Sequence, residues 1–336
     1  AEPNDRAAAM GWLEGPPLCG DNGSGTSILA LIDSLAPPLL RRFPELAGEL
    51  PYLALGRWPT PVQPLPRLSR ELGAELWVKR DDLSGDRYGG NKVRKLEFVL
   101  AEALARQCRT LLGVGGIGSN QLIATAAHAS GLGLSTHGLV FPQPVTEHVR
   151  DNLRLMRALG VRLHPCRNRP LVPLALSLLS GKLEAPYVMA PGASSPLGNL
   201  GFVAAALELH EQIHTGELPE PDAIFVPLGS GGTVAGLALG CRLAGLRTRI
   251  FGVRVVERWL INRTVLGVLL RRTAALLRSH GVALRGPFQG RVEIVSGFLG
   301  RRYGEATQAA IDAVVRAEQR ESLRTVSYTH LRAHET

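Results

Sequence analysis

The chain has 336 residues, of which 45% are hydrophobic, so it is long enough to form about two domains with sizeable cores. Its net charge is +9, but the basic residues are spread along the chain without a basic run, which argues against nucleic-acid binding. The four cysteines form no C-x-x-C pair, and we expect neither a disulfide framework nor a zinc knuckle, in a reducing cytoplasm. The apolar runs are shorter than the roughly 18 residues of a membrane helix, so no membrane partner is expected.

Residues 1–30 show no periodicity and are predicted to form a loose segment. From about residue 75, short β-rich runs alternate with helical patterns, which is typical of βαβ units. The predicted strands lie at or near residues 76–78, 110–114, 138–141, 161, 187, 223–227, 250–255 and 292–295. The predicted helices cover residues 92–106, 120–130, 145–159, 197–214, 233–244, 260–279 and 305–321. The alternation predicts an α/β fold.

Residues 113–118 read G-V-G-G-I-G, which matches the dinucleotide-binding pattern G-x-G-x-x-G between a predicted strand and a predicted helix. The acidic residue that would bind the ribose about 20 residues later is missing, because no Asp or Glu occurs between Gly118 and Glu147. We therefore expect the glycines to let another ligand approach the start of the helix, rather than to bind NAD.

Residues 210–214 read H-E-Q-I-H and match the zinc-binding pattern H-E-x-x-H. Apolar residues at helical spacing in the same segment predict a buried stripe that the two histidines flank. This stripe consists of Phe202, Ala206, Leu209 and Ile213. His214 precedes Gly216, where a helix is expected to end. No third ligand motif follows, so we predict no metal site here.

Two glycine-bearing segments that lie far apart can hold the two ends of one cofactor. Residues 229–233 read G-S-G-G-T between a predicted strand and a predicted helix, a geometry that aims backbone amides at an anion. Residues 89–95 read G-G-N-K-V-R-K, and a lysine forms Schiff bases with carbonyl cofactors once its pKa falls from about 10.4. Each segment alone is also compatible with an ordinary turn or an exposed lysine at a helix start. Together they favour pyridoxal 5'-phosphate.

At this point the chain resembles a known family, the 1-aminocyclopropane-1-carboxylate deaminases and D-cysteine desulfhydrases. The resemblance is carried, in the family's order, by Lys79–Ser84, Gly89–Glu97, Gly115–Gln121, Pro191–Gly198 and Gly229–Thr233. It extends from about Leu39 to Ser322. These proteins are pyridoxal-phosphate enzymes of fold type II, which are similar to the tryptophan synthase β subunit.

The resemblance implies a two-domain α/β fold, in which each domain is a twisted, mostly parallel sheet flanked by helices. The large cofactor-binding domain would comprise residues 31–94 and 205–323. The small domain, residues 95–204, would be inserted into it, with the ligands bound between the two. A homodimer is also expected from the family.

Residue by residue, the resemblance implies three sets of site residues. The catalytic residues would be Lys92, which binds the cofactor covalently, Ser119 and Tyr303. The cofactor would be bound by Lys92 and Asn91, and at its phosphate by Gly229, Ser230, Gly231, Gly232 and Thr233. The carboxylate of a small amino-acid substrate would be bound by Ser119, Asn120 and Gln121.

The expected reaction is the release of ammonia and a 2-oxo acid from a small amino acid. D-cysteine would lose its α-proton and sulfide and give pyruvate, whereas 1-aminocyclopropane-1-carboxylate would undergo ring opening and give 2-oxobutyrate. The alternatives are another β-elimination or β-replacement enzyme of fold type II, such as a serine or threonine dehydratase or a cysteine synthase, and a homologue that binds ligands without turnover. The substrate itself is not determined by the sequence.

The last residues depart from the family pattern. The family closes with a segment similar to E-G-I-x-L-D-P-V-Y-[TE]-G-K, whose tyrosine and following residue reach the active site. Here the resemblance stops near Glu321–Leu323, and Tyr328 lacks the preceding Asp-Pro and stands one residue too close to Glu321. We therefore expect residues 324–336 to be a non-family tail and the activity of this chain to be low.

Overall fold

The computed structural model of the protein describes residues 36–286, 288, 291–301 and 304–323. The predictions of a loose segment at residues 1–30 and a non-family tail at 324–336 lie outside these residues. The helices are α2 (Pro38–Arg42), α3 (Pro66–Leu72), α4 (Val93–Ala105), α5 (Asn120–Ala129), α6 (Glu147–Ala158), α7 (Val172–Ser180), α8 (Pro196–His214), α9 (Gly232–Ala244), α10 (Arg263–Ser279) and α11 (Gln308–Glu321). The strands are β1 (Val62–Pro64), β2 (Trp77–Lys79), β3 (Thr110–Gly116), β4 (Ser135–Phe141), β5 (Arg162–Pro165), β6 (Pro186–Val188), β7 (Ala223–Leu228), β8 (Arg249–Arg254) and β9 (Val292–Val295).

The strands form two parallel sheets and one antiparallel pair. The first parallel sheet has the order β5-β4-β3-β6, and the second has the order β7-β8-β9. Strands β1 and β2 pair in antiparallel fashion. Parallel neighbours need crossover connections, and helices supply them: α5 links β3 to β4, α6 links β4 to β5, and α9 links β7 to β8. The predicted α/β architecture of mostly parallel sheets flanked by helices is thereby confirmed.

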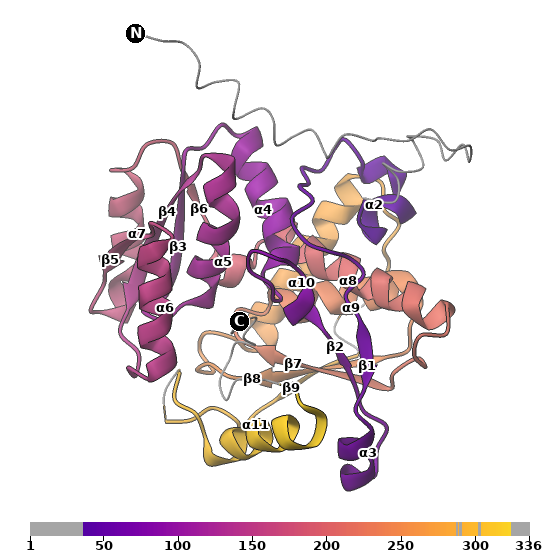
Figure 1. Ribbon diagram of the computed structural model, residues 1–336. Coiled ribbons are helices and arrows are strands. Elements are labelled where there is room, and N and C mark those ends of the chain that lie inside the picture. The colour runs from indigo at the N-terminus through magenta and orange to yellow at the C-terminus, as the bar shows by residue number, and fades with distance from the viewer. Residues whose placement is uncertain (1–35, 287, 289–290, 302–303, 324–336) are drawn as a thin grey trace, which may run out of the picture. The chain divides into compact units, whose positions relative to one another are not determined.

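Helices cover both faces of the first sheet (Figure 1). Leu122 of α5 and Met156 of α6 pack with Val140 of β4 on one face. Because successive side chains of a strand point to opposite faces, Leu139 points the other way, and there it packs in a cluster that α7 covers. Strands covered on both faces must be apolar throughout, which is why β3 and β4 consist mainly of buried residues.

Helix α8 lies in the middle of the packing, between α4 and α9. Most of its 19 residues are buried, and apolar residues surround it on nearly all sides, as expected for a helix without a solvent face. Close approach to α4 depends on Gly201, because a Cβ built there would lie 1.9 Å from the carbonyl oxygen of Arg94. Phe202, Val203 and Leu207 of α8 belong to the largest apolar cluster, which α9 and α10 complete.

Most predicted elements are observed, with shifted ends. Strand β4 starts three residues before the predicted residue 138, and α10 and α11 each start three residues after the predicted 260 and 305. At α10 the reason is a cap: the Asn262 side chain accepts hydrogen bonds from the amides of Thr264 and Val265, which fixes the helix start. Helices α2, α3 and α7 and strand β1 were not predicted. Among the described residues, no helix combines the length and hydropathy needed to cross a bilayer.

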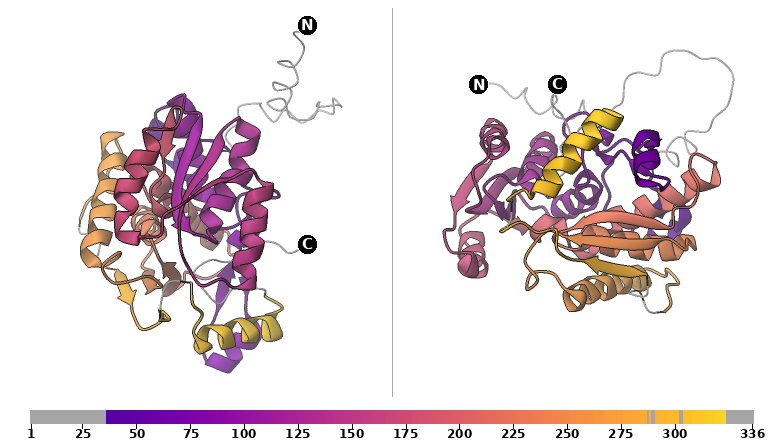
Figure 2. Two further views of the ribbon diagram at one scale, coloured as in Figure 1. Left: turned by 90° about the vertical axis from the view of Figure 1, so that its left-hand side faces the viewer. Right: turned by 90° about the horizontal axis from the view of Figure 1, so that it is seen from below.

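Helix α11 closes the described part of the chain beside α3 (Figure 2, left view). A carboxylate oxygen of Glu321 accepts hydrogen bonds from the backbone amides of Arg67 and Leu68, both at 2.8 Å. Pro66 occupies the first turn of α3, whose amides have no partner within the helix, so Glu321 satisfies donors that would otherwise stay unpaired. Residues more than 250 positions apart are thus joined.

The substitution Gly201→Ala is expected to lower the free energy of unfolding by about 1 to 3 kcal/mol, because a methyl group cannot fit against the backbone of α4 without moving one of the two helices. Chemical denaturation followed by circular dichroism measures this change. Gly181→Ala is the matched control, since its new methyl group would meet only atoms at 3.8 Å. Equal stabilities of the two variants would contradict this account of the helix contact.

Candidate functional site

The carboxyl-terminal edges of the two parallel sheets meet at the predicted site. Strands β3 and β6 are parallel neighbours, so the segments that follow them, 117–121 and 189–194, lie at the same edge. Strand β7 of the other sheet leads directly into residues 229–233. The hydroxyl oxygens of Ser194 and Ser230 are 2.7 Å apart, which joins the two edges. Ligands of parallel α/β sheets bind at such carboxyl ends.

Lys92 lies at the start of α4, where it is the N-cap residue. Its side chain is buried and has no hydrogen-bond or ion-pair partner within the described part of the chain. Burial lowers the pKa of this amine to about 8, since an apolar environment disfavours the charged form. Asn91 is half-buried in the turn just before it. Lys92 therefore has the accessible neutral form that a nucleophilic or proton-transferring amine requires.

Lys95 lies one turn further along α4 and is almost fully buried. Its Nζ donates hydrogen bonds to Ser194 Oγ at 2.9 Å and to the carbonyl of Gly192 at 3.2 Å. Burial, and the nearby charge of Lys92, hold the pKa of Lys95 well below its ordinary value. No carboxylate of the described residues pairs with either lysine. Two buried amines without an anion create a site that is complementary to an added anion.

The loop from Gly229 to Thr233 adds further donors at the same place. The amide of Gly232 donates to Ser194 Oγ at 3.2 Å. A Cβ on Gly232 would lie 2.2 to 2.6 Å from Asn199 Oδ1, Ser194 Oγ and Lys95 Nζ, so only glycine lets these polar atoms converge. Helix α9 starts here, and its first-turn amides and partial positive charge favour an anion.

The donor set of an ammonium group, hydroxyls and helix N-terminal amides fits a phosphate, and the free amine of Lys92 beside it fits a carbonyl-bearing cofactor. Pyridoxal phosphate combines these two groups in one molecule. The residues present therefore fit the cofactor that the two glycine-bearing segments predict. Lys95 and Ser194 were not assigned roles from the sequence, although the spacing of Lys92 and Lys95 places both on neighbouring positions of one helical turn.

The three predicted substrate residues lie at the start of α5. Ser119 is buried, and its hydroxyl has no hydrogen-bond partner among the described residues. The Asn120 side chain is already engaged, since its Oδ1 accepts a 2.6 Å hydrogen bond from Asn152 of α6. Gln121 donates from Nε2 to Thr125 Oγ1 at 3.1 Å, while its buried Oε1 has no partner in the described residues. Among the described residues, the Ser119 hydroxyl, the Asn120 Nδ2 and the Gln121 Oε1 thus have no hydrogen-bond partner.

The predicted catalytic residue Tyr303 lies outside the described residues. Its neighbour Gly304 is placed: a Cβ there would be 3.4 Å from Nε2 of Gln143. Gln143 in turn accepts a hydrogen bond through its Oε1 from the amide of Gly118, at 3.3 Å. Gly304 therefore lies next to the turn that carries Ser119.

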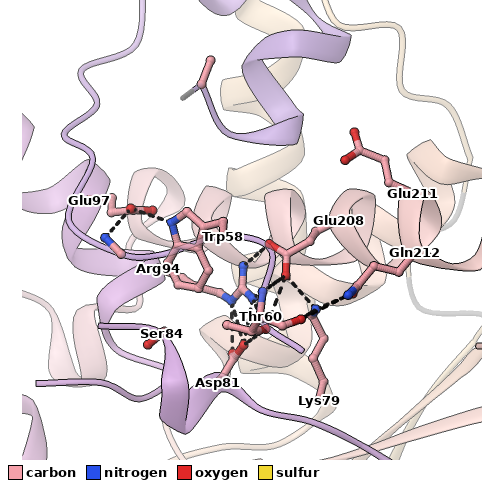
Figure 3. Close-up of polar contacts among 12 residues, drawn as sticks. Trp58, Thr60, Lys79, Asp81, Ser84, Arg94, Glu97, Glu208, Glu211 and Gln212 are labelled. Carbon is pink, nitrogen blue, oxygen red and sulfur yellow. Dashed lines mark hydrogen bonds and ion pairs between the residues drawn. The ribbon is translucent and has the colours of Figure 1, made fainter. Parts of the chain in front are cut away.

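A buried ion-pair cluster positions the first turn of α4 (Figure 3). Arg94 donates to both carboxylate oxygens of Asp81 and to both oxygens of Glu208, at distances between 2.8 and 3.1 Å. Lys79 adds a 2.6 Å ion pair to Glu208, and the guanidinium of Arg94 stacks over the Trp58 ring at 3.9 Å. Burial alone would raise the pKa of Glu208, but the charges of Arg94 and Lys79 outweigh it and lower the pKa to about 2.

Several residues of the segment 79–97, which carries part of the family resemblance, thus have a structural role. Thr60 bridges the cluster, because its amide donates to Glu208 at 2.9 Å and its hydroxyl donates to Asp81 at 3.0 Å. Glu97, one turn beyond Arg94, accepts hydrogen bonds from the indole of Trp58 and the amide of Gly56 through one oxygen. These contacts tie residues 56–60 to α4 and so fix the backbone that carries Lys92 and Lys95.

The two motifs with competing interpretations have ordinary structural contexts. Residues 113–118 form the end of β3 and the turn into α5, as the strand-to-helix context predicted. In the H-E-x-x-H segment, Glu211 forms a 2.6 Å ion pair with Arg41. The predicted apolar stripe of α8 is confirmed, since Phe202 and Leu209 are buried and Ile213 packs against the same cluster. Helix α8 ends at His214, as predicted.

The fold and the site together define a class of protein: an α/β protein with a buried lysine that has no partner among the described residues, and a glycine-rich helix start at the junction of two parallel sheets. The family described as pyridoxal-phosphate dependent enzyme matches residues 53–332. The chain belongs to this family. Its cofactor is pyridoxal phosphate, and its fold is that of the fold-type II enzymes.

Two relatives and one solved structure narrow the similarity. The "Bifunctional D-cysteine desulfhydrase/1-aminocyclopropane-1-carboxylate deaminase, mitochondrial" of Arabidopsis thaliana is 34% identical over 260 residues, which cover 70% of this chain and 63% of the relative. The "D-cysteine desulfhydrase" of Salmonella paratyphi B is 32% identical over 283 residues, 79% of this chain and 81% of the relative. A crystal structure of an "ACC deaminase homologue" superposes with a TM-score of 0.73 at 32% identity, covering 86% of this chain and 85% of that one.

The chain spans less than two thirds of the length of some of its relatives. This share is 63% for the Arabidopsis thaliana protein and 64% for a Pyrococcus abyssi relative that is 39% identical over 216 residues. More distant structures share the fold alone, among them a threonine deaminase with a TM-score of 0.52 at 23% identity.

The substitution Glu208→Gln is expected to lower the free energy of unfolding by about 3 to 5 kcal/mol, because it leaves Arg94 buried with half of its compensating charge. Denaturant titration near pH 7 measures this loss. The control is Glu211→Gln on the same helix, whose partly exposed pair with Arg41 is expected to contribute less than about 1 kcal/mol.

The same carboxylate predicts a pH dependence of stability. Its folded-state pKa of about 2 lies below the ordinary value of 4.5, so its contribution is fully present above pH 4.5 and is lost as the pH falls toward 2. The difference in stability between the wild type and Glu208→Gln should therefore shrink through this range. A constant difference from pH 6 down to pH 2 would contradict the depressed pKa.

Proposed function

We propose that the chain is a pyridoxal-phosphate dependent lyase or deaminase that acts on a small amino acid, of the 1-aminocyclopropane-1-carboxylate deaminase or D-cysteine desulfhydrase type. It would release ammonia and a 2-oxo acid. The observation that carries the proposal is the pair of neighbouring buried lysines, Lys92 and Lys95, which have no carboxylate partner in the described residues, and of which Lys95 lies beside Gly232 of the glycine loop. The names of the two relatives support the substrate class.

The proposed roles divide between the two ends of the cofactor. Lys95, Ser194 and the loop from Gly229 to Thr233 would hold the phosphate, and the side chain of Asn91 would lie near the ring. The amine of Lys92 would bind the cofactor covalently. When bound, pyridoxal phosphate supplies an electron sink for negative charge at the substrate α-carbon.

The chain's own residues would orient the substrate and move its protons. Lys92 Nζ is the candidate base, since its pKa of about 8 leaves roughly a tenth of the amine neutral at pH 7, far more than the ordinary value of 10.5 allows. Ser119 offers a hydroxyl without a partner among the described residues at the amino end of α5, where the helix dipole favours a substrate carboxylate, whereas the unpaired Gln121 Oε1 is an acceptor and would meet a donor of the substrate instead. Asn120 would contribute through its backbone amide and its Nδ2, because Asn152 engages only its Oδ1. Tyr303 is proposed as the further catalytic residue.

We further propose a two-domain organisation, a homodimeric state and a cytoplasmic location. Strands β3 to β6 fall within residues 95–204 and strands β7 to β9 within 205–323, which supports a small inserted domain and a large domain of residues 31–94 and 205–323. The family resemblance supports a cytoplasmic homodimer, which light scattering on the purified chain would test.

The activity is tested by adding candidate substrates to the purified protein loaded with pyridoxal phosphate and measuring ammonia and 2-oxo acid. We expect turnover of D-cysteine or of 1-aminocyclopropane-1-carboxylate above that of D- or L-serine, and loss of turnover and of the cofactor's protein-bound absorbance band in Lys92→Ala. Faster release from L-serine or L-threonine would instead favour a dehydratase. Cofactor binding without release from any of these substrates would favour a homologue without catalytic activity.

Lys95→Met is expected to weaken the binding of pyridoxal phosphate by roughly 10- to 100-fold, because a hydrogen bond to a charged group contributes about 1.5 to 3 kcal/mol. Titration of the apoenzyme, followed by absorbance, measures this affinity. Lys182→Met, which changes an exposed lysine, is the matched control and should bind like the wild type. An unchanged affinity of the Lys95→Met protein would remove this lysine from the phosphate site.

A further inference from the structure

A cavity lies at the carboxyl end of α9, whereas the glycine loop of the proposed cofactor site lies at the amino end of the same helix. Its volume is about 750 Å³, within the range of small-molecule sites. The cavity lies between the end of α2, the end of α9, the start of β8 and the segment after α10. No role in the proposed reaction uses it.

Four arginines line this cavity: Arg42, Arg242, Arg285 and Arg291. In the described residues none of them forms an ion pair with a carboxylate. Other arginines do, for example Arg94 with Asp81 and Arg169 with Glu257. Glu220 lies close enough for its charge to act on the lining residue Cys241. Its carboxylate accepts a hydrogen bond from the backbone amide of Arg247 and forms no ion pair with the four arginines. The cavity is therefore a concentration of arginines that have no ion-pair partner among the described residues.

Contacts within the protein use only some of the hydrogen-bond donors of these guanidinium groups. Arg42 donates to the carbonyl of Leu243 at 3.3 Å, Arg242 donates to that of Arg285 at 2.6 Å, and Arg291 donates to that of Leu246. These bonds satisfy carbonyls near the end of α9, where cations are favoured. Each guanidinium has five N–H donors, however, so most of them stay unused. Arg285 donates from its side chain to none of the described residues.

The apolar part of the lining complements the charge. Phe43 and Ile250 contribute an apolar wall on the same cavity. Guanidinium groups bind phosphate oxygens in bidentate geometry, and an aromatic ring adds a stacking surface for a planar group.

We propose that this cavity binds a phosphorylated small molecule with a planar apolar part, such as a nucleoside polyphosphate. The phosphates face Arg42, Arg242, Arg285 and Arg291, and the planar part packs against Phe43. This site is separate from the proposed catalytic site and does not depend on the activity assigned to the chain. Its ligand is recognised by charge and shape, so no covalent step is involved.

The test uses the cofactor-loaded protein and ATP as the probe, with binding measured by isothermal titration calorimetry at about 0.15 M salt, where exposed charges farther apart than about 8 Å are screened. We expect saturable binding of one ATP per chain to the wild type. The double variant Arg42→Gln/Arg285→Gln should bind ATP at least tenfold more weakly. Inorganic tripolyphosphate should bind more weakly than ATP, because it lacks the planar group.

The control is Arg271→Gln/Arg272→Gln, which removes the same charge from exposed positions of α10 outside the cavity lining. It should bind ATP like the wild type, which separates the cavity from general attraction to a basic protein. Arg285→Gln alone removes no hydrogen bond to the described residues, so its weaker binding cannot be attributed to misfolding. The proposal is overturned if the wild type shows no saturable binding, or if the two double variants lose affinity equally.

Discussion

The buried ion pairs of Arg94 with Asp81 and Glu208 are the constraint on which the site depends. Moving these charges out of water costs several kcal/mol per ion, so the cluster is not primarily a source of stability. Its consequence is geometric, because Arg94 satisfies both carboxylates only in one arrangement of α4, α8 and the segment around Thr60. Lys92 and Lys95 lie on either side of Arg94 in the sequence, so the contacts of Arg94 also fix the backbone positions of these two lysines.

Charge is compensated differently at neighbouring positions of this one helical turn. Arg94 points to Glu208 and Asp81, whereas Lys92 and Lys95 point away from any described carboxylate. Residues one or two positions apart do not share a helix face. The same turn can therefore bury the ion-paired Arg94 on one side and Lys92 and Lys95, which have no described carboxylate partner, on the other. The side with the two lysines is the one where the proposed anionic cofactor would supply the missing charge, and the side with Arg94 joins α4 to α8.

The sequence revealed the parts of the site that are local in the chain. The glycine loop after β7, the turn before α5 and Lys92 follow from short motifs beside elements with clear periodicity. Lys95 could have been recognised from its spacing to Lys92, but its burial depends on α8, which approaches α4 only because of Gly201. The pairing of Arg94 with Glu208 joins residues 114 positions apart, and no local pattern indicates which arginine a glutamate will meet.

Few side chains near the start of α5 are available to contact the proposed substrate. On this edge, Asn120 Oδ1 is engaged by Asn152, while the Ser119 hydroxyl and the Asn120 Nδ2 have no partner among the described residues and are the side-chain donors that the proposed substrate carboxylate would meet. The opposite edge is formed by Gln143, which contacts both Gly118 and the position of Gly304. Gln143, which lies outside every motif of the sequence, therefore lies beside both the Ser119 turn and Gly304 of the carboxyl-terminal segment.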